Sequence, residues 1–161
     1  MGRPRAAIVA VTAAASLGGW WLGTARAPTL GSPVVTAVVD GDTIEVRWPG
    51  RSALVRLLNV DAPETVHPRR PVECFGPEAA AFTREALLGR RVHLDFDRVR
   101  VDRYGRLLAH VSVDGRRVGE ELLSGGYARL MIIPPNGARG RSMLDLELAA
   151  RSQGRGLWGA C

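Results

Sequence analysis

The pattern of hydrophobic and polar residues after position 33 begins with strands. β-Branched residues dominate 34–40 and 43–48, and the Asp-Gly-Asp between these runs predicts a turn. A Pro-Gly turn at 49–50 then leads to a third apolar run over 52–60. We therefore expect three consecutive strands joined by short turns.

The rest of the chain predicts helices and two further strands. Strong helix formers follow Pro77 and precede Gly89, which suit the first turn and the end of a helix. Alternating residues predict strands, and apolar residues at helical spacing predict helices. The expected elements are helices over 78–88, 118–124 and 141–153 and strands over 91–96 and 107–113.

This order of elements limits the fold. Five strands with one helix inserted after the third, and more helix after the fifth, form neither a βαβ repeat nor a sandwich. The prediction is an α+β, mainly β domain: a five-stranded Greek-key barrel of the OB type with about three helices. The 161 residues suit one such domain plus an extension. Many functions occur on this fold, so the function depends on the site.

The N-terminal 27 residues have the layout of a targeting segment. An uncharged run over 6–23 follows two arginines, and Ala25 and Ala27 form a small-residue cleavage motif. This predicts an export signal at 1–27, a linker at 28–32 and a folded domain at 33–161. The alternative is an uncleaved membrane anchor with Trp20 and Trp21 at the interface. Both place the domain outside the cytoplasm, as a secreted protein or a membrane-anchored one.

The charge favours a polyanionic partner. All 22 basic residues are arginine, and the net charge is +6. Removal of 1–27 leaves 19 arginines and 16 acids, a charge of 19 − 16 = +3. A basic surface suits nucleic acid or an anionic membrane, although it also serves solubility.

Two cysteines, Cys74 and Cys161, form the whole cysteine content. An oxidising compartment permits a disulfide that ties the C-terminus to a long loop, and the alternative is two unpaired thiols. The sequence contains no Cys-x-x-Cys motif or histidine cluster of the kind that binds zinc.

Acidic residues flank the strand turns. Asp40 and Asp42 bracket a glycine, while Asp61 and Glu64 follow the third strand. If the turn and the strand end meet, their like charges require a cation. Carboxylate oxygens favour Ca²⁺ or Mg²⁺, and few protein ligands leave an open site.

Two arginines complete this pattern. Arg56 lies in the third strand and Arg106 closes a turn before the fifth. Guanidinium groups beside a cation can bind a phosphate through two hydrogen bonds each. Glu64 could then position or deprotonate an attacking water. The alternative is a set of surface salt bridges.

Four motifs in order, "VVDGDTIEV", "VRLLNVDAPET", "CFGPEAAAFTREAL" and "DRYGRLLAHV", resemble the staphylococcal nuclease (thermonuclease) family. The resemblance covers about 34–128, with a weaker match up to Trp158. It implies an OB barrel and calcium-dependent hydrolysis of phosphodiester bonds in DNA and RNA, with little sugar specificity and with 3′-phosphate ends.

The resemblance also implies roles for seven residues, and the chain departs from the family pattern at Ala62, at 131–133 and in its two cysteines; the second of these departures bears on substrate binding. Met131, Ile132 and Ile133 stand where the best-known member has two tyrosines against the base, so we expect weaker or differently selective substrate binding. No obligate protein partner is indicated, and we expect a monomer. The implied roles are calcium ligation by Asp42, Asp61 and the Ala62 carbonyl, general base action by Glu64, phosphate contacts by Arg56 and Arg106, and a phosphate hydrogen bond from Tyr104.

Two other functions remain open from sequence. One is an OB module that binds nucleic acid without cutting it; the retained acids and arginines argue against it. The other is a membrane-tethered scaffold whose acids bind structural calcium, which predicts calcium-dependent melting without turnover.

Overall fold

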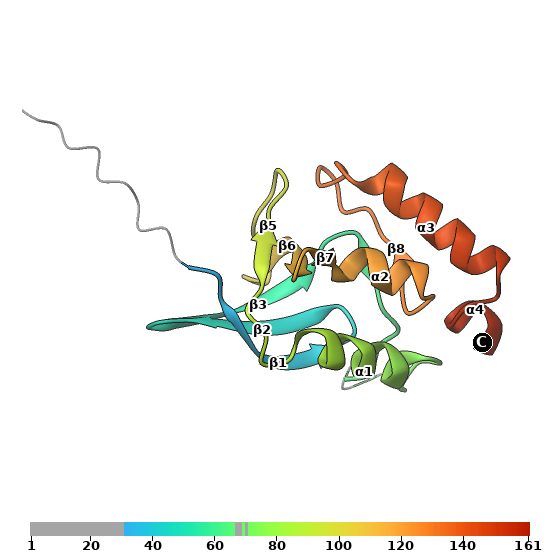
Figure 1. Ribbon diagram of the computed structural model, residues 1–161, viewed down its shortest axis with the longest axis horizontal. Coiled ribbons are helices and arrows are strands. Elements are labelled where there is room, and N and C mark those ends of the chain that lie inside the picture. The colour runs from blue at the N-terminus through green and yellow to red at the C-terminus, as the bar shows by residue number, and fades with distance from the viewer. Residues whose placement is uncertain (1–30, 67–68, 70) are drawn as a thin grey trace, which may run out of the picture.

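The computed structural model describes residues 31–66, 69 and 71–161 (Figure 1). The predicted signal or anchor at 1–27 and most of the predicted linker lie outside the described residues. The first strand begins at Val34, directly after the predicted domain boundary.

None of the helices within the described ranges is long and apolar enough to cross a membrane.

One mixed sheet has six strands, of which five follow the order β1-β2-β3-β6-β5 and a short sixth strand pairs with β6. Neighbours are antiparallel except β3 and β6, which are parallel. An isolated bridge between Val34 and Arg91 links β1 to the segment just before β5, so the two ends of the strand path meet. The predicted OB-type α+β fold is confirmed. The strands are β1 (Val34–Asp40), β2 (Thr43–Trp48), β3 (Arg51–Leu57), β5 (His93–Asp95) and β6 (Leu107–Val113).

The predicted third strand over 52–60 is too long. β3 ends at Leu57, and Asn59 has a φ of 61°, a left-handed conformation that asparagine tolerates better than most residues. This turn redirects the chain, so β4 (Val60–Asp61) pairs with β8 (Arg129–Leu130) in a separate two-stranded sheet. The sequence pattern missed β8 and also β7 (Arg116–Arg117), which pairs with β6.

The three predicted helices are present within two residues of their expected bounds. They are α1 (Gly76–Leu87), α2 (Val118–Ser124) and α3 (Gly140–Ser152). The single turn α4 (Leu157–Ala160) was not predicted. Pro77 lies in the first turn of α1, and Ala79, Ala86 and Leu87 of that helix are buried.

The core lies between the sheet and the helices. α1 packs against β1, and α2 contacts both β6 and α3; α2, α3 and α4 gather at one end of the molecule (Figure 1). Each fully buried aliphatic side chain contributes about 1.5–3 kcal/mol. This packing fixes the β1–β2 turn and the end of β3. The largest fully buried side chains include Ile44, Leu57, Leu58, Leu87, Leu122, Leu123 and Met143.

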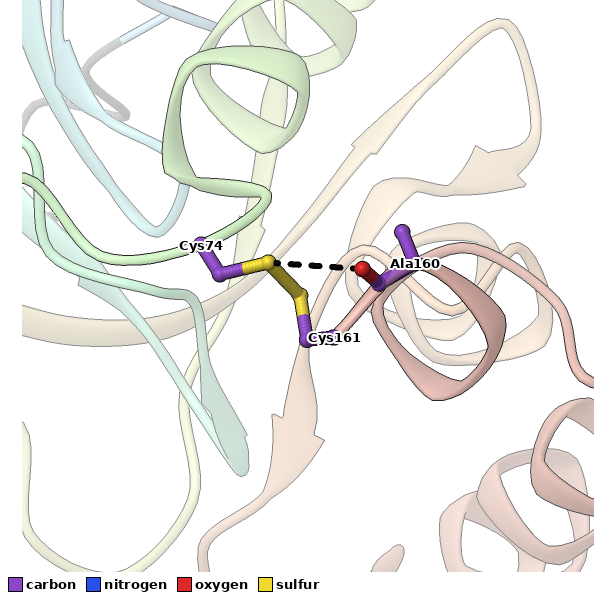
Figure 2. The surroundings of a disulfide bond; sticks show 3 residues. All are labelled: Cys74, Ala160 and Cys161. Carbon is purple, nitrogen blue, oxygen red and sulfur yellow. Dashed lines mark hydrogen bonds between the residues drawn. A yellow bond between two sulfur atoms is a disulfide. The ribbon is translucent and has the colours of Figure 1, made fainter.

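A disulfide bond joins Cys74, in the loop before α1, to Cys161 at the C-terminus (Figure 2). Their Cα atoms are 6.1 Å apart, and 87 positions separate them in the sequence. The structure thus contains the predicted bridge and ties the loop before α1 to the C-terminal turn.

Candidate active site

The turn between β1 and β2 is held in place from both sides. The N–H of Asp42 donates to Asp40 Oδ1 at 3.0 Å, and the buried Thr83 hydroxyl of α1 donates to the Gly41 carbonyl at 2.6 Å. A Cβ atom on Gly41 would lie 2.6 Å from the Cβ of Ala62. Glycine therefore allows the turn to approach the chain that follows β4 closely enough to bring Asp42 beside it.

Arg56 connects this turn to Asp61. Its Nη1 donates to the carbonyls of Leu57 and Val60 at 3.0 and 2.6 Å. Its Nη2 lies 3.1 Å from Asp42 Oδ2 and 3.2 Å from Asp61 Oδ1. Because the guanidinium is buried and held by two carbonyls, it fixes the relative positions of the two aspartates.

Asp42 is a buried carboxylate, only 5% exposed. Its Oδ2 accepts the N–H of Ala62 at 2.8 Å, and its Oδ1 accepts the Thr43 hydroxyl at 3.0 Å. Burial raises the pKa of Asp42 to about 7, although Arg56 acts in the opposite direction. One arginine does not offset the loss of hydration, and an additional cation would favour the ionised form.

Glu64 is bound to the backbone around it and to a second acid. Its Oε1 accepts the N–H groups of Thr65 and Val66 at 3.0 and 2.9 Å. The N–H of Glu64 donates to Glu73 Oε2 at 3.3 Å, and the N–H of Glu73 donates to the Glu64 carbonyl at 2.8 Å. The Glu64 carboxylate is therefore held by its own loop, and that loop is held by Glu73.

Arg106 precedes β6 and is oriented by Asp102. Its Nε donates to Asp102 Oδ2 at 2.7 Å, and Asp102 Oδ1 accepts the N–H groups of Tyr104 and Arg106 at 2.9 Å. Burial opposes ionisation of Asp102, but these hydrogen bonds outweigh it and lower its pKa below the ordinary value. Asp102 thus stays charged and holds Arg106 through one nitrogen.

These side chains border one polar cavity of about 230 Å³. Its lining includes six of the seven residues for which the sequence indicated a role in the site. Tyr104 is the exception: it is 67% exposed, and the guanidinium groups of Arg103 and Arg106 lie 4.7 and 5.4 Å from its ring centroid. The lining residues are Asp40, Asp42, Thr43, Arg56, Asp61, Ala62, Glu64, Glu73 and Arg106.

Glu73 and Thr43 are the lining residues that sequence reasoning missed. Thr43 directly follows Asp42, so its position gave a signal. Glu73 lies in a proline-rich loop, and no pattern indicated that this loop folds back onto Glu64. A larger cavity of about 420 Å³ beside Trp48 and Phe96 has no acidic residue in its lining, so it offers no carboxylate ligands.

The acidic cavity fits a hard cation with an incomplete protein shell. Within the described ranges, no three acidic, histidine or cysteine side chains form a metal-binding cluster. The expected donor set of two aspartates and one carbonyl does not need a third such side chain. All these donors are oxygen atoms, which suit Ca²⁺ or Mg²⁺ and leave positions for water or substrate.

The fold and the cavity define an OB-type α+β domain with an acidic cavity bordered by two arginines. The family model for staphylococcal nuclease homologues matches residues 54–160. The chain is 43% identical over 105 residues to the thermonuclease of Staphylococcus intermedius, covering 65% of this chain and 62% of that protein. It is 36% identical over 124 residues to the thermonuclease of Staphylococcus hyicus, covering 77% and 73%. It is 39% identical over 122 residues to the SPbeta prophage-derived endonuclease YokF of Bacillus subtilis (strain 168), covering 74% and 41%.

The chain therefore belongs to the staphylococcal nuclease family. It spans less than two thirds of the Staphylococcus intermedius and Bacillus subtilis relatives.

Proposed function

We propose that the protein is a calcium-dependent nuclease that hydrolyses phosphodiester bonds in DNA and RNA with little sugar specificity and leaves 3′-phosphate ends. The observation that carries the proposal is the convergence of Asp42, Asp61, Glu64, Arg56 and Arg106 on one cavity. Relatives named thermonuclease and endonuclease support the same class of reaction.

Asp42, Asp61 and the Ala62 carbonyl would hold the cation. Bound there, calcium would supply a positive charge that stabilises negative charge on the phosphate during hydrolysis. Ionised Asp42 is costly in the buried site, so this ligand has most to gain from a cation.

The arginines would bind the scissile phosphate. With a cation on the two aspartates, the Nη2 of Arg56 no longer serves as their only counter-charge and can donate to a phosphate oxygen. Arg106 uses its Nε for Asp102, which leaves its other two nitrogens for the phosphate. Preorganised donors of this kind stabilise the charge that develops in the transition state.

Glu64 would orient and deprotonate the attacking water. Its carboxylate lines the cavity, and the N–H groups of Thr65 and Val66 fix one of its oxygens. The second oxygen can accept a proton from water, since the two backbone donors occupy Oε1 alone. Tyr104, exposed beside Arg106, would contact a neighbouring phosphate of a bound strand.

We further propose that the domain acts outside the cytoplasm, as a secreted or membrane-anchored monomer without an obligate protein partner. The residue pattern of 1–27 supports export. The disulfide fits an oxidising compartment.

The test compares Glu64→Gln with Glu85→Gln, a control at an exposed α1 residue outside the cavity lining. We expect Glu64→Gln to lower kcat by about 100-fold or more, because general base catalysis contributes at least that much. Calcium affinity should stay unchanged, whereas Asp42→Asn should weaken it. Near-normal turnover of Glu64→Gln would remove Glu64 from its role. A wild type that folds and binds calcium but shows no turnover would instead favour the OB module that binds nucleic acid without cutting it.

A further inference from the structure

The loop that carries Glu64 is held by the segment before α1, which includes Glu73 and Cys74 and which we call the clasp. Both backbone polar groups of Glu64 are bound by one residue, since Glu73 accepts its N–H and donates to its carbonyl. A Cβ atom on Gly76 would lie 2.8 Å from Thr65 Cγ2 and 3.1 Å from the Glu64 carbonyl oxygen. The two segments are thus in contact at Glu73 and again at Gly76, the first residue of α1.

The disulfide connects this clasp to the body of the domain. Cys74 follows Glu73 directly, and its bond to Cys161 reaches the end of α4 (Figure 2). Leu157 anchors α4, because its side chain is buried and its N–H donates to the Gly126 carbonyl at 2.8 Å. The bridge therefore restrains the backbone directly beside Glu73.

Two further contacts hold the described part of this segment: the N–H of Gly76 donates to the Glu73 carbonyl at 3.0 Å, and the ring of Phe75 lies 5.6 Å from the ring of Tyr127. Glu73 and Cys74 are both exposed, so hydrophobic packing contributes little to their position. The side-chain bond from Glu64 N–H to Glu73, at 3.3 Å, is a long one. A covalent tether one residue away would limit the range of positions that such a loop explores.

We propose that Glu73 is a positioning residue for Glu64, and that the Cys74–Cys161 bond acts in catalysis by keeping Glu73 in place. This inference rests on the proposed function, because it assigns Glu64 the attacking water. A bridge that serves stability alone would change the unfolding transition without changing the kcat of folded protein.

The experiment measures kcat, KM and calcium Kd for the full chain on single-stranded DNA, at a temperature where circular dichroism shows every variant folded. The variants are Glu73→Ala, Glu73→Gln, the control Glu85→Ala, the double variant Cys74→Ser/Cys161→Ser, and that double variant combined with Glu73→Ala. Glu85→Ala removes the same charge from an exposed residue outside the cavity lining.

We expect Glu73→Ala to lower kcat about tenfold, because a small displacement of a catalytic group has effects of that size or larger. KM and calcium Kd should stay as in the wild type. Glu73→Gln should keep most of the activity, since its amide oxygen still accepts the Glu64 N–H. The cysteine variant should also lose kcat, and adding Glu73→Ala to it should cost less than Glu73→Ala does in the wild type.

Four results would overturn the proposal. The first is a Glu73→Ala variant that is as active as Glu85→Ala, and the second is a Glu73→Gln variant that is as impaired as Glu73→Ala. The third is a folded cysteine variant with the kcat of the wild type, and the fourth is a combined variant in which the two losses of kcat multiply in full. If the cysteine variant does not fold, the two Glu73 variants decide alone. An inactive wild type in calcium would refute the proposed function itself, whereas an active wild type with unaffected variants would refute only this inference.

Discussion

Replacement of Asp42 by asparagine should make the calcium-free protein more stable at neutral pH. The folded-state pKa is about 7 and the ordinary value is 3.8. Ionisation in the folded state is therefore unfavourable: its cost is absent below about pH 4, grows as the pH rises, and is complete above about pH 7. A difference of about three pH units corresponds to about 4 kcal/mol. Asparagine resembles the protonated acid and avoids this cost.

Urea unfolding in chelator at pH 4 to 8 measures the effect. Wild type and Asp42→Asn should have similar free energies of unfolding near pH 4, and the variant should exceed the wild type by up to about 4 kcal/mol at pH 8. Asp145→Asn, at an exposed α3 position, is the control and should follow the wild type. Parallel profiles for Asp42→Asn and wild type would refute the reasoning. Saturating calcium should stabilise the wild type more than the variant, because only the folded wild type keeps the full ligand set.

Three further predictions concern the bridge, the turn and the substrate. Cys74→Ser/Cys161→Ser should lower the free energy of unfolding by up to about 5 kcal/mol, because the bridge closes a loop across 87 positions; a loss below about 1 kcal/mol in denaturant titrations would contradict it. Thr83→Val should cost about 1–3 kcal/mol and weaken calcium binding, since it leaves the buried Gly41 carbonyl without its donor; calorimetry showing neither change would exclude this role. Met131→Tyr should lower KM for single-stranded DNA, because a stacked base contributes about 1–3 kcal/mol; an unchanged KM would count against stacking there.

The order of strands and helices followed from the sequence because each main element carries its own periodicity. β1 and β2 have the bounds that the β-branched runs predicted. The third strand was overextended because Leu57 to Val60 is apolar throughout, and only the turn at Asn59 ends it. The partner of β4 lies about 70 residues further along the chain, and two-residue strands have no periodicity to detect.

The candidate site was predictable where its residues lie in turns and at strand ends. Asp42 and Arg56 were identified in this way, and the structure places Arg56 Nη2 3.1 Å from Asp42 Oδ2. Glu73 could not be identified, because its contact with Glu64 depends on how an irregular loop closes. The high exposure of Tyr104 could not be predicted from the sequence either, since the same turn motif can direct a side chain toward a cavity or away from it.

The most direct test of the central claim is the release of acid-soluble nucleotides from single-stranded DNA by the full chain in calcium, in magnesium and in chelator, beside Arg56→Ala. The account predicts release in calcium, none in chelator, and a large loss in Arg56→Ala. That substitution removes the guanidinium that pairs with Asp42 and Asp61 and that would bind the phosphate. Equal release in chelator, or full activity of Arg56→Ala, would contradict it.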